Sequence, residues 1–171
     1  LLESELQKQR VGGIDIEIIP SQGIIPEGES PIQALQQNPK ASIVIATGLA
    51  KTGDADACVT MGSTGAAMAA AVFLLGTMEG IDRPALGGPA IGFSSETVLI
   101  DLGSTVDCRP NQLVDYGVMG TVFARTFLGI QDPTVGLLTV GSESGKGNRQ
   151  IRESYDLFQQ SGLNFIGNIE G

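Results

Sequence analysis

Short stretches of apolar residues, some alternating with polar ones, predict the strands of this chain. Residues Ile14 to Ile19 alternate isoleucine with acidic residues, which is typical of a strand with one face in water. Other apolar runs end abruptly at glycine or polar residues, as strands buried in a sheet do. The predicted strands of this second kind are Ala57–Met61, Ala85–Ile91, Thr97–Leu102, Val135–Val140 and Leu163–Ile166.

Capping residues and helical spacing of apolar positions predict helices between these strands. Ser30 and Pro31 provide an N-cap and a first-turn proline for a short helix that ends near Asn38. Pro110 precedes a longer amphipathic stretch, and Gly129 is its expected stop. That stretch, Asn111–Leu128, is a predicted helix, and the remaining predicted helices are Leu1–Arg10, Ala66–Leu75 and Arg149–Ser161.

The stretch from Ser42 to Gly53 is ambiguous. Ile43, Val44 and Ile45 favour a strand by propensity, whereas Ser42 is a suitable cap for a helix that runs on to Leu49. The periodicity alone does not decide between the two.

Strands that alternate with helices, joined by short glycine-bearing loops, indicate the α/β class with a largely parallel sheet flanked by helices. With 171 residues and 42% hydrophobic residues, the chain is long enough for one such domain with a buried core. We therefore treat residues 1–171 as part of a single α/β domain.

The charge of the chain argues against nucleic acid as a partner. The formal net charge is −9, and no basic run occurs anywhere, whereas nucleic-acid binding requires clustered Lys and Arg. A small anion is still a possible ligand, because backbone N–H groups and one well-placed cation can hold it. An acidic protein partner would need a local basic patch.

The chain has no histidine, which excludes Ser-His-Asp and Cys-His chemistry and the usual zinc sites from this segment. No carboxylate cluster has metal-ligand spacing, so we expect neither metal nor cofactor. Cys58 and Cys108 are far apart in sequence and are expected to be reduced thiols of a cytoplasmic protein. Cys58, inside an apolar run, is a predicted core residue, and Cys108, beside the anionic Asp107, is a predicted passive thiol.

Three polar loops leave the ends of predicted strands, where parallel α/β sheets bind their ligands. They are Gly62–Gly65, Asp101–Asp107 and Gly141–Asn148. The first offers hydroxyls and free N–H groups at a helix start, but is equally explained as a plain Ser/Thr cap. The second places two carboxylates around a Gly-Ser-Thr turn, or is simply an Asx-turn.

The third loop places Lys146 between glycines, with serines and Asn148 around it. Three residues separate Gly141 from Gly145, and Gly147 follows the lysine, so the loop is not a P-loop, which needs four residues and then Ser or Thr. A solvated surface lysine is the alternative interpretation of this loop.

Five segments in order resemble the phosphate:acyl-[acyl-carrier-protein] acyltransferases, the PlsX family. The resemblance is strong from Ser42 to Gly171 and weak before it. The segments are Asp54-Ala-Asp-Ala-Cys-Val-Thr-Met-Gly-Ser-Thr-Gly-Ala66, Gly80-Ile-Asp-Arg-Pro-Ala85, Val98-Leu-Ile-Asp-Leu-Gly103 through Asp107, Val135-Gly-Leu-Leu-Thr-Val-Gly141 with Lys146-Gly-Asn148, and Asn164-Phe-Ile-Gly-Asn-Ile-Glu-Gly171. This chain has Ser63 where the family usually has Asn, and Ser104-Thr105 where it usually has Ala-Asn.

The resemblance implies a three-layer fold like that of isocitrate and isopropylmalate dehydrogenases, with Ser42–Gly53 as a helix. It implies transfer of a fatty acyl group from acyl carrier protein to inorganic phosphate for phospholipid synthesis. It further implies a homodimer with loose peripheral membrane association. The family's first strand and its C-terminal part are expected to lie outside these residues, so that the segment alone is expected to be inactive.

The implied reaction assigns roles to the three loops. Lys146 is the expected cation, and the hydrogen-bond donors are expected to be Ser63, Thr64, Ser104 and Asn148. Asp101 and Asp107 are expected to orient loops, and Gly62, Gly65 and Gly103 to border the phosphate or substrate. The alternatives are a phosphotransacetylase-like enzyme that uses coenzyme A, a dehydrogenase that shares the fold, and a non-catalytic α/β scaffold.

Overall fold

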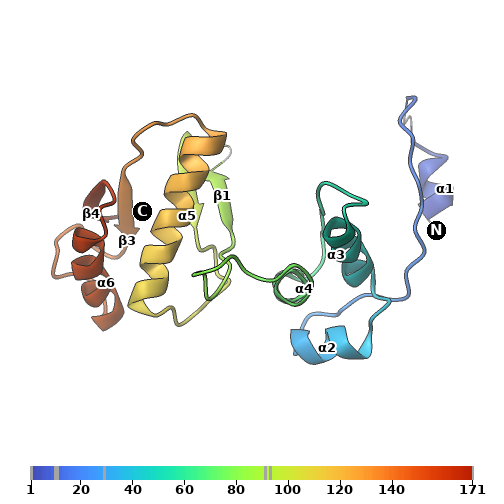
Figure 1. Cartoon of the computed structure of the whole chain (residues 1–171), viewed down its shortest axis with the longest axis horizontal. Coiled ribbons are helices and arrows are strands. Elements are labelled where there is room, and N and C mark those ends of the chain that lie inside the picture. The colour runs from blue at the N-terminus through green and yellow to red at the C-terminus, as the bar shows by residue number, and fades with distance from the viewer. Residues whose placement is uncertain (1, 10–11, 29, 91, 93, 171) are drawn as a thin grey trace. The chain divides into compact units, whose positions relative to one another are not determined.

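The computed structural model describes residues 2–9, 12–28, 30–90, 92 and 94–170. The chain forms two compact units, Leu1–Gly76 and Thr77–Gly171, and each is described by itself (Figure 1). The sequence predicted that residues 1–171 belong to one domain. Whether the two units pack together as one domain stays a prediction. The predicted element ends at Leu1, Arg10 and Ile91 lie outside the described residues.

The regular elements in the described part of the first unit are all helices, and long stretches between them have no regular structure. The helices are α1 (Leu2–Leu6), α2 (Pro31–Gln37), α3 (Ser42–Thr52), α4 (Thr64–Ala70) and the π-helical turn η1 (Ala71–Leu75), which continues from α4 (Figure 1). Their core is built mainly from small residues, so that α4 packs closely on both α2 and α3. The buried residues are Ile25, Ala34, Leu35, Ala41, Ala66 and Ala70.

Helix α3 resolves the ambiguity of the sequence at Ser42–Gly53. The residues form a helix, as the resemblance implies, although Ile43, Val44 and Ile45 favour a strand by propensity. Ile43 and Val44 pack against the buried core of the unit. Tertiary packing therefore outweighs the local β preference.

Two predicted strands of the first unit are wrong. Neither Ile14–Ile19 nor Ala57–Met61 forms a strand, and the described residues of this unit contain no strand. A strand forms only with a partner that accepts its ladder of hydrogen bonds. Val59 and Met61 are consequently 89% and 99% exposed. The prediction that Cys58 is a core residue is wrong for the same reason, because its thiol is exposed.

The second unit is a mixed α/β structure, which confirms the α/β class. It contains β1 (Gly87–Ala90), β2 (Ser94–Ile100), α5 (Pro110–Phe127), β3 (Val135–Leu138), α6 (Arg149–Gln160) and β4 (Phe165–Ile169). Helix α5 contacts both α6 and β2 (Figure 1). Phe158 of α6 is 2% exposed and stacks on Phe165 at a centroid distance of 5.0 Å.

The described strands form two separate sheets of two strands, so the single layered parallel sheet is not confirmed. Strands β3 and β4 are parallel, with α6 as their crossover. Strands β1 and β2 are antiparallel, contrary to the expectation. Only residues 91–93 separate them, and a parallel pair needs a connection of about a dozen residues or more.

Candidate functional site

The Gly62–Gly65 turn begins helix α4 in the first unit. Ser63 is the N-cap, and its Oγ accepts a hydrogen bond from the backbone N–H of Ala66 at 3.5 Å. The Thr60 hydroxyl accepts from the N–H of Gly62 at 3.1 Å. Ser63 thus performs the capping duty that the sequence allows, whereas the hydroxyl of Thr64 makes no hydrogen bond to the described residues.

A cavity of about 540 Å³ adjoins this turn within the first unit. Gly62 and Ser63 line it together with apolar side chains, among them Ile24, Ile43 and Met61. The turn therefore has free space next to it, of the size that small-molecule sites occupy.

In the Asp101–Asp107 loop of the second unit, the polar groups of two loop residues hydrogen-bond each other. Asp101 Oδ1 accepts hydrogen bonds from the backbone N–H of Ser104 at 2.9 Å and from the Ser104 hydroxyl. Ser104 Oγ in turn accepts from the N–H of Leu86 at 3.4 Å. The Asp101 carboxylate therefore caps a local turn, as the Asx-turn interpretation supposed, but it bonds the N–H three residues on and not the two of an Asx-turn. Asp107 is exposed and makes no hydrogen bond or ion pair to the described residues.

Cys108 lies beneath this turn as a buried free thiol. Its Sγ is 3.6 Å from Asp101 Oδ2 and donates to it. Burial raises the pKa of the Cys108 thiol, and the charge of Asp101 raises it further. The carboxylate that contacts the thiol is therefore Asp101, not the adjacent Asp107. Burial likewise raises the pKa of Tyr116, whose hydroxyl lies next to this cluster.

The Gly141–Asn148 loop holds Lys146 by its aliphatic stem. A Cβ atom at the buried Gly141 would lie 2.8 Å from Lys146 Cγ, so only glycine leaves room for the stem. The lysine side chain is 54% exposed, and its Nζ is 4.0 Å from Glu143 Oε2. The Lys146 ammonium is consequently held near the loop surface by a weak ion pair.

Contacts from α6 and β4 fix the backbone of this loop. Asn168 Nδ2 donates to the Glu143 carbonyl at 2.8 Å, and Arg152 Nη1 donates to the Gly147 carbonyl at 3.2 Å. Gly147 has a φ of 91°, and a Cβ atom there would lie 2.7 Å from Ile151 Cγ2. The loop is therefore anchored at several points and is not a free surface segment.

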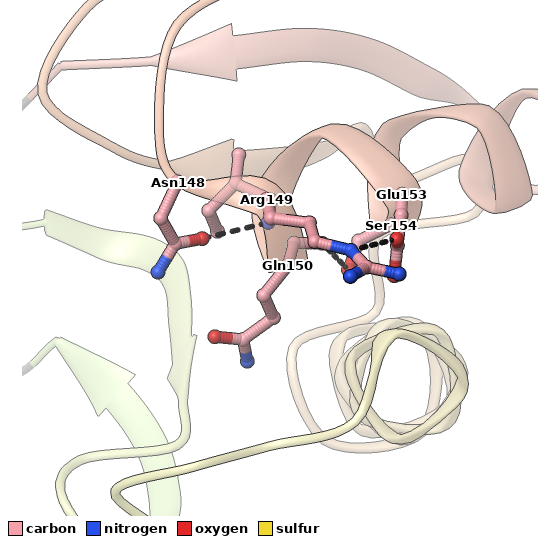
Figure 2. Close-up of polar contacts among 6 residues, drawn as sticks. Asn148, Arg149, Gln150, Glu153 and Ser154 are labelled. Atoms are coloured by element: carbon pink, nitrogen blue, oxygen red, sulfur yellow. Dashed lines mark hydrogen bonds and ion pairs between the residues drawn. The ribbon is translucent and has the colours of Figure 1, made fainter.

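Asn148 ends the loop as the N-cap of α6. Its Oδ1 accepts a hydrogen bond from the N–H of Ile151 at 2.9 Å, and Figure 2 shows its amide nitrogen on the side away from the helix. That nitrogen makes no hydrogen bond to the described residues. At the start of the helix, Arg149 pairs with Glu153 at 2.6 Å (Figure 2). The free amide thus stands at the positive end of a helix of 12 residues.

The three candidate loops are divided between the two units. Gly62–Gly65 lies in the first unit, and the other two loops lie in the second. In the part of the second unit that the structure describes, no hydrogen bond or ion pair joins the Asp101–Asp107 loop to the Gly141–Asn148 loop. The strands before these two loops, β2 and β3, belong to different described sheets, and no described strand precedes Gly62–Gly65. The prediction that the three loops leave one sheet edge is therefore not confirmed.

The sequence predicted no role for Asn168 or Arg152. Both anchor the Gly141–Asn148 loop, hereafter the lysine loop. The available signal was the polar Asn168 within an otherwise apolar run, Phe165–Ile169. Among the described residues, no group of three or more His, Cys, Asp or Glu side chains is arranged to hold a metal ion. Likewise, no described helix has the length and apolar character that crossing a membrane requires.

Comparison with known proteins assigns the chain to a family. A family model described as "fatty acid synthesis protein" matches residues 2–171. A phosphate acyltransferase of Pelotomaculum thermopropionicum is 46% identical over 170 residues, which are 99% of this chain and 49% of that protein. The phosphate acyltransferase of Desulforamulus reducens is 41% identical over 170 residues, with 99% and 51% covered. That of Acaryochloris marina is 46% identical over 167 residues, with 96% and 48% covered.

The chain thus spans about half the length of the curated relatives that it matches. The match nevertheless runs through both units and all three candidate loops. This chain therefore belongs to the family of fatty acid synthesis proteins that includes these phosphate acyltransferases.

Proposed function

We propose that this protein transfers a fatty acyl group from acyl carrier protein to inorganic phosphate, and that the acyl phosphate feeds phospholipid synthesis. The observation that carries the proposal is the similarity, over nearly the whole chain, to relatives named phosphate acyltransferase. The homodimer and the loose membrane association stay predictions from the resemblance.

The chemistry fits a chain without histidine. A phosphate oxygen attacks the thioester carbonyl, a C–O bond forms, the C–S bond breaks, and the carrier's thiolate leaves and takes up a proton. Phosphate is already an anion at neutral pH, so the attack needs no strong base. It needs a cradle for phosphate and donors for the oxyanion of the tetrahedral intermediate.

The lysine loop supplies such a cradle in our proposal. Among the described residues the Lys146 ammonium has one ion pair, of 4.0 Å, so it can move to a phosphate oxygen at little cost. The free amide nitrogen of Asn148 and the N-terminus of α6 lie at the same loop end and favour an anion. Lys146 and Asn148 are therefore the proposed catalytic residues.

The other two loops have different roles. In the Gly62–Gly65 turn, the Thr64 hydroxyl and the space beside Gly62 and Ser63 are available to substrate. In the second unit, Asp101 and Ser104 use their polar groups on each other. We infer that this pair shapes its loop, and that Gly103 and the exposed Asp107 are the positions through which the loop faces substrate.

A hydroxamate trap tests the function. The protein as its gene encodes it is incubated with long-chain acyl carrier protein, phosphate and hydroxylamine, and acyl hydroxamate is measured against a phosphate-free control. We expect phosphate-dependent hydroxamate, and we expect it also in the presence of a chelator. Hydroxamate formed from acyl coenzyme A but not from acyl carrier protein would favour the phosphotransacetylase-like alternative, and no phosphate dependence would overturn the proposal.

A further inference from the structure

Asn168 is a buried polar residue on a strand and contacts the loop of the proposed catalytic lysine. It lies in β4 opposite Leu137 of β3 and is 6% exposed. Its Nδ2 donates to the backbone carbonyl of Glu143 at 2.8 Å. We propose that Asn168 is a positioning residue, which sets the place of Lys146 through this carbonyl. The proposal rests on the proposed function only for the role of Lys146.

The Glu143 carbonyl links Asn168 to the lysine. The same oxygen accepts a second hydrogen bond, from the backbone N–H of Lys146 at 2.9 Å. It therefore closes the turn from residue 143 to residue 146 while the strand holds it from the other side. If the carbonyl loses its contact with Asn168, the turn can rotate and carry the Lys146 backbone with it. The Lys146 stem would then leave its position over Gly141.

Stability alone does not account for an asparagine at this position. Its Oδ1 is buried and has no hydrogen-bond partner among the described residues. Leaving a buried acceptor unpaired costs at least as much free energy as a single neutral hydrogen bond returns. An apolar side chain of the same size would fill the space without that cost. The benefit of Asn168 therefore lies in the geometry of the loop.

The chain offers a matched control four residues earlier. Asn164 precedes β4, and its Nδ2 donates to Asp132 Oδ2 at 3.1 Å on the surface of the same unit. Asn164→Leu removes an amide donor near the same strand without touching the Gly141–Asn148 loop. Asn168→Leu and Asn168→Asp both remove the donor to Glu143, the first with an apolar and the second with an isosteric side chain.

Limited proteolysis measures the loop independently of activity. Trypsin cleaves after Lys146, and the cleavage rate of a native loop reports how often it opens. We expect Asn168→Leu and Asn168→Asp to increase the rate of cleavage at the Lys146–Gly147 bond by about tenfold or more, while Asn164→Leu leaves it within about twofold. Mass spectrometry identifies the bond that is cut. Equal rates in wild type and in both Asn168 variants would overturn the proposal.

Steady-state kinetics then separate positioning from a general structural role. Asn168→Leu should keep a melting temperature near that of wild type, whereas the buried carboxylate of Asn168→Asp should lower it. Both variants should raise the KM for phosphate and lower kcat/KM by about tenfold or more. The KM for the acyl donor should change by less than about twofold. Loss of the folded protein in both variants would assign Asn168 a purely structural role and overturn the proposal.

The two measurements distinguish this inference from the proposed function. If the wild type makes no acyl phosphate but the loop opens in the Asn168 variants, the proposed function is wrong and the positioning contact stands. If the wild type is active and the loop and kinetics of the variants are unchanged, the contact is irrelevant to Lys146.

Discussion

The two polar loops of the second unit, Asp101–Asp107 and Gly141–Asn148, satisfy their polar groups in opposite ways. In Asp101–Asp107, side chains hydrogen-bond one another, so that Asp101 and Ser104 have few groups left for a ligand. In Gly141–Asn148, side chains from α6 and β4 hold the backbone, so that the Lys146 ammonium and the amide nitrogen of Asn148 stay available. Two loops that both combine glycine with small polar residues can therefore have different roles. Asp101–Asp107 acts as a scaffold, and Gly141–Asn148 leaves polar groups available to a ligand.

The origin of the difference is the distance in sequence between partners. The Asp101 carboxylate reaches Ser104 and Cys108, three and seven residues away, and closes a local turn. The lysine loop is instead held by Asn168, 25 residues beyond Glu143. The Asp101 turn is closed mainly by neighbouring residues, with one longer contact from the N–H of Leu86 to Ser104 Oγ, whereas the lysine loop depends on the β3–α6–β4 crossover for its shape.

The largest effect that would sharpen this comparison is expected from Lys146. If its ammonium binds phosphate and the developing oxyanion, Lys146→Ala should lower kcat/KM on the order of 10²-fold or more, by analogy with single oxyanion donors. The side chain is half exposed, so the melting temperature should stay near that of wild type. Hydroxamate kinetics and thermal melts of the gene's full product measure both quantities.

Lys146→Arg is the conservative partner of this variant. It should recover only part of the activity, because a planar guanidinium does not replace a compact ammonium above Gly141. If Lys146→Ala keeps more than about half of the wild-type activity, Lys146 is a solvated surface residue, since such changes are usually near neutral. The contrast between the two loops would then have no catalytic meaning.

The next effect concerns the stability of the Asp101–Asp107 loop, which is the scaffold loop of this comparison. Asp101→Ala removes the acceptor for both groups of Ser104 and for the Cys108 thiol. Unpaired, half-buried donors should cost about 1–3 kcal/mol in the free energy of unfolding. Both tyrosines lie in the second unit, so urea unfolding followed by tyrosine fluorescence reports on this unit.

Asp107→Ala is the matched control at the other end of the same loop. Asp107 is exposed and has no hydrogen bond to the described residues, so its loss should change the free energy of unfolding by less than about 0.5 kcal/mol. Equal losses in the two variants would show that the hydrogen bonds of Asp101 do not stabilise the unit.

A smaller effect is expected in the reactivity of the two thiols. Cys108 is buried and its pKa is raised, first by burial and then by Asp101, whereas Cys58 is exposed. A higher pKa leaves less thiolate at pH 8, so iodoacetamide should alkylate Cys58 at least about tenfold faster than Cys108. Peptide mass spectrometry gives both rates. Comparable rates would mean that the scaffold loop is open in solution.

The sequence predicted the helices of the second unit well because their signals are local. Pro110 and Asn148 stand at the starts of α5 and α6, and the apolar spacing continues from there. The antiparallel pairing of β1 and β2 followed from the short connection between them and was missed because strand type was inferred from the overall alternation. Ala57–Met61 failed because pairing with another strand, not propensity, determines a strand.

The candidate site was predictable only as separate loops. Glycines mark where Lys146 and Asn148 stand, since Gly141 gives room for the lysine stem and Gly147 adopts a positive φ. No local pattern relates Glu143 to Asn168, because their contact exists only after β4 has paired with β3. The contact of the Cys108 thiol with Asp101 spans only seven residues, and it was missed because only the adjacent Asp107 was considered.

The smallest effect is expected from the side chain of Glu143. Its Oε2 lies 4.0 Å from Lys146 Nζ, and the two side chains are 70% and 54% exposed. An exposed pair at this distance contributes at most about 0.5 kcal/mol, so Glu143→Ala should leave the unfolding free energy nearly unchanged. Hydrogen bonds from Asn168 and Lys146 go to the backbone carbonyl, which the substitution keeps.

Activity of Glu143→Ala therefore distinguishes the carbonyl from the carboxylate as the group that places the lysine. If the carbonyl does so, kcat/KM for phosphate stays within about twofold of wild type, and the salt dependence of KM changes little because the lost ion pair is already screened. A tenfold loss of kcat/KM in Glu143→Ala, with an intact fold, would mean that the carboxylate positions the ammonium of Lys146. The lysine loop would then work like the scaffold loop, by side chains that hold one another, and the contrast between the two would disappear.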